Sequence, residues 1–350
     1  MELQFTILIA YSRKDSMKID LIVPCFNAHE KLPRLLGSII SQTIVNDLEI
    51  TLVNDGDNKN YKDIINTFSP YISIKEIKLE INGGPGVARQ YGFDNTSNPL
   101  VMFIDADDTL AGAFSLKVLR EQMLTEQENV ICIGSFLEEQ FDHYINHEQD
   151  TVWMFGKLYK RSFLDKYKIR FNETRANEDT GFNMLCKLIS NENERIKFIQ
   201  DIVYYWHSNP NSITRINNCE YSYNQSFVGY TDNMIWALKE AEKRNPFNGN
   251  ILFQKAVIMV NLYEYYIETV ERDSRFVKQN WECCKKYYKE VYKEIKDKIS
   301  DDILKEVYND IMRNAYLGDK LVGIIPSMGI YEFLEKLEKE IDKPCNSMEN

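Results

Sequence analysis

The sequence predicts an α/β fold in which a mixed, mainly parallel sheet is flanked by helices and followed by a helical C-terminal region. Two observations predict the sheet. Short apolar runs alternate with helical patterns over roughly the first 215 residues, and polar residues follow three of these runs, after Val23, Val53 and Ile104. In parallel sheets of this kind, ligands lie beyond the carboxyl ends of the strands. A third observation predicts the C-terminal region, because helical patterns dominate and Gly and Pro become rare beyond about Glu220.

The N-terminal elements are predicted from apolar periodicity. In the first helix the apolar residues share one face, and Pro33 is tolerated in the first turn. The run from Leu48 to Val53 is rich in β-branched residues, which favours a strand. A glycine turn over 82–86 leads into a helix but lacks the spacing of a dinucleotide-binding loop. We expect strands over 19–23, 48–53, 72–79 and 101–104, with helices over 30–42, 61–68 and 87–92 between them.

The remaining elements follow from the same criteria. We expect helices over 114–123 and 178–189, strands over 130–136 and 199–206, and an aromatic stretch followed by a helix within 153–169. The predicted domains are an N-terminal extension (1–17), an α/β domain (18–218) and a helical region (219–350).

The helical region carries an apolar seam from Trp281 to Ile299, which we expect to form a core or a helix–helix interface, and self-association through these helices is left open. Six lysines between 285 and 298 line the opposite face. We favour a solvated face, since acidic residues are interspersed, and leave contact with an anionic membrane surface open.

Composition bounds the class of protein. The chain has 350 residues, of which 44% are hydrophobic, and its net charge of −11 disfavours broad contact with nucleic-acid phosphates. Seven scattered cysteines without a C-x-x-C pair are typical of reduced cytosolic thiols. No apolar run is long enough to span a bilayer, and the run at residues 5–10 lacks the basic flank of a signal peptide. We therefore expect a cytoplasmic protein, with a position at the inner face of the membrane left open.

Three carboxylates, Asp105, Asp107 and Asp108, directly follow a buried strand. Unpaired buried charge is costly, so these side chains need a cation. Oxygen ligands at this spacing suit Mg²⁺ or Mn²⁺, whose coordination is completed by waters and substrate phosphates. The alternative is a helix N-cap, but one Asp would be enough for that, so three favour a metal–phosphate site.

Taken together, several stretches of the chain resemble the family 2 glycosyltransferases, nucleotide-sugar enzymes of GT-A fold. The match covers roughly residues 18–215 and rests on the order and spacing of pieces that are weak individually. The resembling pieces are Ile22-Val23-Pro24-Cys25-Phe26-Asn27, Ser41-Gln42-Thr43, Val53-Asn54-Asp55-Gly56, Asn82-Gly83-Gly84 with Ala88-Arg89, Asp105-Ala106-Asp107-Asp108, Gly156-Lys157-Leu158-Tyr159 and Glu178-Asp179. The departures at Cys25, Phe26 and Asn54 bear on the choice of nucleotide base.

The resemblance implies roles for individual residues. Asp55 would accept a hydrogen bond from a uracil-type base, and Arg89 would lie near the base and the diphosphate. Asp179 would be the general base, although an acid in the first turn of a helix is also explained by the helix dipole. The implied nucleotide-sugar site comprises Pro24, Phe26, Asn27, Asp55, Gly84, Arg89, Asp105, Ala106 and Asp107, and the implied metal ligands are Asp107, Asp108 and His207.

Some of these roles have open alternatives. The sequence does not decide between Asp107 and Asp108 as the main metal ligand. A lone His after a strand is usually a surface or capping residue, but imidazole also suits Mn²⁺, so both roles stay open for His207. Arg215 is a weaker candidate for a contact with phosphate.

The resemblance therefore implies an inverting, metal-dependent hexosyl- or N-acetylhexosaminyltransferase of the bacterial or phage cell-surface polysaccharide or teichoic-acid type. It would move a sugar from a UDP-sugar to a hydroxyl of a glycan, polyol-phosphate or lipid-linked acceptor, with Mn²⁺ or Mg²⁺ as cofactor. Three alternatives stay open: a catalytically degenerate protein that binds nucleotide or glycan, a related nucleotidyl-sugar enzyme, and a transferase that glycosylates modified nucleic acid. The sequence names neither the sugar nor the acceptor.

Overall fold

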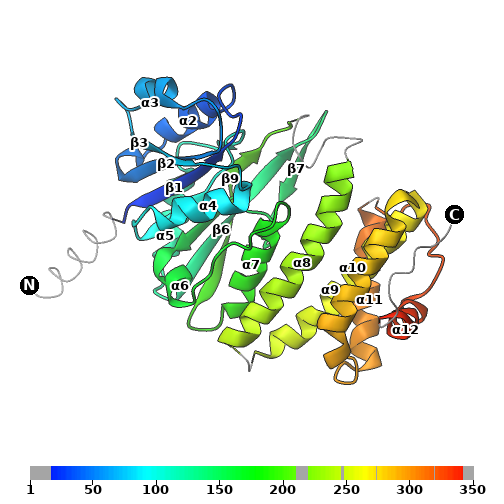
Figure 1. Ribbon diagram of the computed structural model, residues 1–350. Coiled ribbons are helices and arrows are strands. Elements are labelled where there is room, and N and C mark those ends of the chain that lie inside the picture. The colour runs from blue at the N-terminus through cyan, green and yellow to red at the C-terminus, as the bar shows by residue number, and fades with distance from the viewer. Residues whose placement is uncertain (1–16, 210–219, 246–247, 273, 319, 342–350) are drawn as a thin grey trace, which may run out of the picture. The chain divides into compact units, whose positions relative to one another are not determined.

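The computed structural model describes residues 17–209, 220–245, 248–272, 274–318 and 320–341 (Figure 1). The chain divides into two compact units, residues 1–215 and 216–350, and each is described by itself. The predicted extension up to residue 16, Arg215 and the predicted domain boundary near 218 lie outside the described residues.

The first unit contains a nine-stranded mixed sheet within its described residues. Its strands are β1 (Ile19–Cys25), β2 (Leu48–Asp55), β3 (Ser73–Leu79), β4 (Leu100–Phe103), β5 (Thr109–Leu110), β6 (Asn129–Glu139), β7 (Tyr144–His147), β8 (Lys157–Lys160) and β9 (Arg195–Trp206). The order is β3-β2-β1-β4-β8-β6-β9-β5, and β7 pairs with β6. Strands β3, β2, β1 and β4 are parallel, as are β6 and β9, whereas β8 is antiparallel to both its neighbours.

Helices flank this sheet, as Figure 1 shows. They are α2 (Leu32–Ile40), α3 (Lys62–Phe68), α4 (Pro85–Asp94), α5 (Ser115–Met123), α6 (Arg161–Lys166) and α7 (Glu178–Ile189), with a 3₁₀ turn at Val45–Asp47. The apolar faces of α2 and α5 form one buried cluster with the sheet. Helix α4 packs on β1 and β2, where Gly92 permits close approach, because a Cβ there would lie 2.4 Å from Cγ2 of Ile22. The predicted α/β fold class is confirmed.

Three short strands were missed by the sequence patterns. Strand β5 has two residues, which is too short for any periodicity, and β7 is largely exposed and so lacks an apolar face. Strand β8 begins with Lys157, which is 1% exposed, and a lysine is not a residue that predicts burial.

The second unit is helical, as predicted. It consists of α8 (Glu220–Arg244), α9 (Gly249–Arg272), α10 (Val277–Glu290), α11 (Asp301–Leu317) and α12 (Ile330–Glu340), with 3₁₀ turns at Ser274–Phe276 and Tyr292–Glu294. The predicted seam is buried from Trp281 to Ile295 and half-buried at Ile299, although α10 ends at Glu290 within it. Among the described residues, no helix is long and apolar enough to cross a membrane.

Candidate active site

The predicted site residues meet at one edge of the sheet because of strand register. Cys25 of β1 pairs with Asn54 of β2, and Ile22 of β1 pairs with Phe103 of β4. The polar stretches that follow these three parallel strands therefore leave the sheet at the same edge. This is the edge at which the sequence predicts that ligands bind.

Asp55 lies at the end of β2 and is held by the glycine turn. Its Oδ1 accepts a hydrogen bond from the Gly83 N–H at 2.8 Å, and its Oδ2 accepts one from the Gly84 N–H at 2.9 Å. Gly84 has a φ of 88°, which favours glycine. Burial raises the pKa of Asp55 against the effect of these two donors. Each carboxylate oxygen keeps a second lone pair for a ligand.

A second carboxylate, Asp57, organises the loop after β1, and the sequence patterns did not assign it a role. Its Oδ2 accepts hydrogen bonds from the Asn27 N–H at 2.7 Å and from the Tyr61 hydroxyl at 2.6 Å. Asn27 is held there with a left-handed φ of 53°, and the neighbouring Phe26 is 51% exposed. The only signal in the sequence was that Asp57 belongs to the polar stretch after the second strand.

Arg89 lies between two carboxylates and is 3% exposed. Its Nη2 donates to Asp105 Oδ1 at 2.6 Å, and its Nη1 donates to Glu178 Oε1 at 2.5 Å. Although burial opposes it, Asp105 and Glu178 together raise the pKa of Arg89, so the guanidinium is charged. The bridge joins the end of β4 to the start of α7, whereas the sequence suggested only a contact with the nucleotide.

The three acids after β4 differ in their surroundings. Asp108 is 1% exposed, and its two oxygens accept from the Tyr204 hydroxyl at 2.7 Å and from the His207 N–H at 2.9 Å. Burial raises its pKa, and so do Asp105 and Asp107. The side chains of Asp105 and Asp107 are each 30% exposed, and Asp107 accepts from Asn209 Nδ2 at 2.6 Å. Two of the three carboxylates therefore remain accessible to a ligand.

His207 has both ring nitrogens engaged. Nε2 lies 2.8 Å from Thr109 Oγ1, and Nδ1 lies 3.1 Å from Glu139 Oε2. Burial lowers the pKa of His207, which favours its neutral form. To bind a metal, this side chain would have to give up one of the two contacts.

The acids of the Glu-Asp pair open α7. Glu178 is buried, whereas Asp179 is half-buried and its Oδ1 accepts from the Thr180 N–H at 2.8 Å. Burial raises the pKa of both carboxyl groups; Asp179 further raises the pKa of Glu178, and Asp105 further raises that of Asp179. A carboxylate with a raised pKa is a stronger base, so the surroundings of Asp179 suit proton abstraction.

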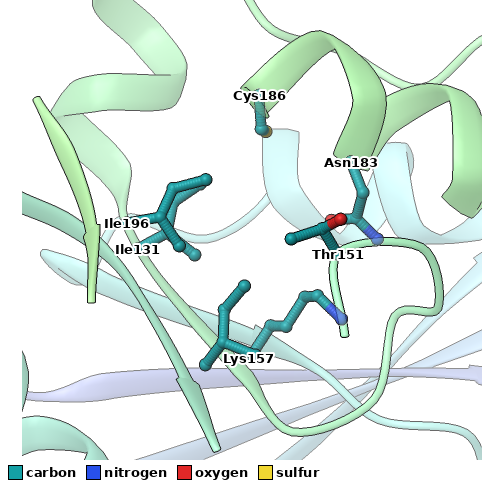
Figure 2. Close-up of a pocket in the computed structure, with 7 residues that line it drawn as sticks. Ile131, Thr151, Lys157, Asn183, Cys186 and Ile196 are labelled. Carbon is teal, nitrogen blue, oxygen red and sulfur yellow. The ribbon is translucent and has the colours of Figure 1, made fainter. Parts of the chain in front are cut away.

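A buried lysine, Lys157, lines a small pocket together with Asn183 and Cys186 of α7 (Figure 2). Lys157 Nζ donates to Asp150 Oδ1 at 3.2 Å, to the Phe155 carbonyl at 3.4 Å and to the Trp153 carbonyl. Asn183 Nδ2 of α7 donates to the carbonyls of Val152 and Trp153. The loop 150–155 is thus tied to the helix that carries Asp179. The adjacent cavity of about 10 Å³, close to the smallest that holds one water, is lined by Ile131, Ile133, Thr151, Lys157, Asn183, Cys186 and Ile196.

Several known proteins are similar to this chain in sequence. Residues 20–178 match the model of glycosyl transferase family 2. The uncharacterized glycosyltransferase EpsJ of Bacillus subtilis (strain 168) is 26% identical over 224 residues, which cover 57% of this chain and 63% of EpsJ. The poly(ribitol-phosphate) beta-N-acetylglucosaminyltransferase TarP of Staphylococcus aureus (strain N315) is 24% identical over 313 residues, which cover 75% of this chain and 92% of TarP.

A solved structure shows the same fold. The crystal structure of S. aureus TarS 1–349 in complex with UDP-GlcNAc superposes with a TM-score of 0.65 at 17% identity, covering 86% of this chain and 92% of that one. The shared length varies among the sequence relatives. This chain spans 63% of EpsJ but only 32% of the glycosyltransferase GlyA of Streptococcus pneumoniae.

Proposed function

Residues 20–178 of this chain form a glycosyl transferase family 2 domain, and on that premise we propose that the protein transfers a sugar from a UDP-sugar to an acceptor hydroxyl with inversion at the anomeric carbon. One observation carries the proposal. Arg89 bonds to Asp105 and to Glu178, which brings the acids that follow β4 close to the first turn of α7. A donor that binds at the acids after β4 therefore lies near Asp179, whose carboxylate can take a proton.

The donor binds along the carboxyl ends of β1, β2 and β4. Asp55 accepts a hydrogen bond from the base, and its orientation is fixed in advance by the two glycine N–H groups. The exposed ring of Phe26 offers a surface for the base to stack on. The residues proposed to surround the nucleotide sugar are Pro24, Phe26, Asn27, Asp55, Gly84, Arg89, Asp105, Ala106 and Asp107.

A divalent cation fits the acids after β4. Within the described residues, no group of three or more His, Cys, Asp or Glu side chains is arranged around a metal. Mg²⁺ and Mn²⁺ in nucleotide sites, however, need only one or two carboxylates, and Asp105 and Asp107 are accessible. We propose Asp107 as the principal ligand, with Asp108 and His207 as ligands only after rearrangement. When bound, the cation neutralises charge on the departing diphosphate.

Asp179 acts as the general base. Its carboxylate takes the proton of the acceptor hydroxyl, the hydroxyl oxygen forms a bond to the anomeric carbon, and the bond from that carbon to the diphosphate breaks, releasing UDP. The raised pKa of Asp179 suits this proton transfer near neutral pH.

We propose a polyol-phosphate glycan as the acceptor. The support is the extent of the match to TarP, a poly(ribitol-phosphate) transferase by name, of which this chain spans 92%. The proposal places the reaction in the cytoplasm, where the nucleotide-sugar donor would be available to it.

The test is Asp179→Asn, which keeps the size of the side chain but does not take a proton near neutral pH. Turnover, measured as UDP released from UDP-N-acetylglucosamine or UDP-glucose with poly(ribitol phosphate) and Mn²⁺, should fall by roughly 10²–10⁴. The affinity for UDP should be unchanged. Asp165→Asn on α6 is the matched control, since Asp165 is exposed and lies outside the site. Wild-type turnover by a folded Asp179→Asn variant would remove Asp179 from the mechanism.

A further inference from the structure

The first residue of α7, Glu178, forms a buried ion pair with Arg89. The proposed reaction gives Glu178 itself no direct part. Glu178 is 4% exposed, and its partner Arg89 is 3% exposed. Removing one member of such a pair leaves the other charge buried and uncompensated. Because Arg89 also holds Asp105, the three charged groups form a continuous link from β4 through α4 to α7.

The glycine turn makes room for this link. A Cβ at Gly86 would lie 2.6 Å from Cγ and 3.0 Å from Cβ of Glu178. Contacts under 3.0 Å force atoms to move, so a residue without a side chain at 86 is needed for Glu178 to reach Arg89.

The position of Glu178 sets the position of Asp179. Glu178 is the first residue of α7, and it follows Asn177, which has a left-handed φ of 58°. Successive side chains in a helix project about 100° apart, so anchoring Glu178 against α4 also fixes the direction of Asp179.

We propose that Glu178 is a positioning residue for the transfer reaction: bound to Arg89 in the space left by Gly86, it holds Asp179 at a set distance from the donor-binding acids after β4. This inference rests on the proposed function, since it assigns a role relative to that base. It assigns to Glu178 no contact with substrate.

Two variants test the inference, one by removing a charge and the other by filling the space at residue 86. Glu178→Gln keeps the shape of the side chain but removes its charge, and Gly86→Ala keeps all charges but forces Glu178 to move. Each should lower kcat by roughly 10–100-fold, since a displacement of about 1 Å costs up to about 100-fold. The KM for UDP-N-acetylglucosamine and the Kd for UDP should stay within about threefold of wild type. A role limited to stability would lower the melting temperature and leave kcat of the folded protein unchanged.

The controls are matched to each variant. Glu264→Gln removes another buried glutamate, 3% exposed, from α9 of the helical unit. Gly112→Ala adds a methyl group where nothing lies within 4 Å. Both should retain wild-type kcat.

The outcomes separate the inference from the proposed function. A loss of kcat at constant Kd in both folded variants, Glu178→Gln and Gly86→Ala, supports the positioning role. Wild-type kcat in either variant, together with an inactive Asp179→Asn, would overturn the positioning role alone. Absence of UDP release by the wild-type protein with UDP-N-acetylglucosamine, UDP-glucose and poly(ribitol phosphate), or full activity of Asp179→Asn, would overturn both.

Discussion

Replacing Lys157 with Met should destabilise the α/β unit by about 2–4 kcal/mol. The side chain is 1% exposed and donates to Asp150, to the Trp153 carbonyl and to the Phe155 carbonyl. Methionine has a similar length but donates no hydrogen bond. The three acceptors are affected to different degrees, and the magnitude follows from what each of them retains.

Asp150 keeps the N–H groups of Val152 and Trp153, and the Trp153 carbonyl keeps Asn183. The Phe155 carbonyl loses the lysine donor, and a buried carbonyl left unsatisfied costs about 1–3 kcal/mol. Loss of the charge pair with Asp150, whose side chain is 16% exposed, adds a smaller contribution because water can partly replace the lysine. A domain of 150–250 residues loses about 2–4 °C in melting temperature per kcal/mol, so we expect a drop of about 5–15 °C.

Thermal unfolding of Lys157→Met beside Lys160→Met measures this difference. Lys160 is half-buried on the same strand, and within the described part of the chain its Nζ donates to the Gln127 carbonyl at 2.8 Å, so that variant should lose about 1 kcal/mol or less. A Lys157→Met melting temperature within about 2 °C of wild type would refute the reasoning. It would mean that relief from burying the ammonium group offsets the lost contacts, as occurs in some buried ion pairs.

Four further outcomes are expected. The affinity for UDP, measured by calorimetry, should fall in EDTA, and undiminished affinity would remove the metal from the donor site. Because burial raises the pKa of Asp179, kcat should fall as the pH is lowered through a value above the usual carboxylate range, and a fall that begins only at the usual carboxylate pKa would contradict this. Burial raises the pKa of Glu178, so part of the wild-type stability should be lost as the pH rises through that pKa; melts at pH 5 and pH 8 should therefore show wild type losing melting temperature relative to Glu178→Gln at the higher pH, and parallel changes would speak against the shift. Gly92→Ala should cost about 1–3 kcal/mol in urea unfolding, because its Cβ would lie 2.4 Å from Ile22, and a stabilised variant would show that this contact yields.

The sequence predicted the elements that repeat a local pattern. The strand from Leu48 and the helix from Leu32 carry their own periodicity, and the structure has both. It also predicted which strand ends would meet, since parallel strands joined by helices leave their polar ends on one edge. By contrast, β8 was missed because its buried Lys157 is satisfied by oxygens of the loop before it, which no local pattern reveals.

Only the tertiary structure determines which of the acids are already paired and which are accessible. In the sequence Asp107 and Asp108 are adjacent and equivalent. In the structure Tyr204, 96 residues from Asp108, donates a hydrogen bond to Asp108, whereas the side chain of Asp107 is accessible. In the same way Arg89 reaches Glu178 across 89 residues. The sequence determined that this edge of the sheet would be acidic, because residue type and strand pattern are local properties. Only the fold determined which carboxylates are already paired, because the free energy of a buried charge depends on partners brought to it from distant parts of the chain.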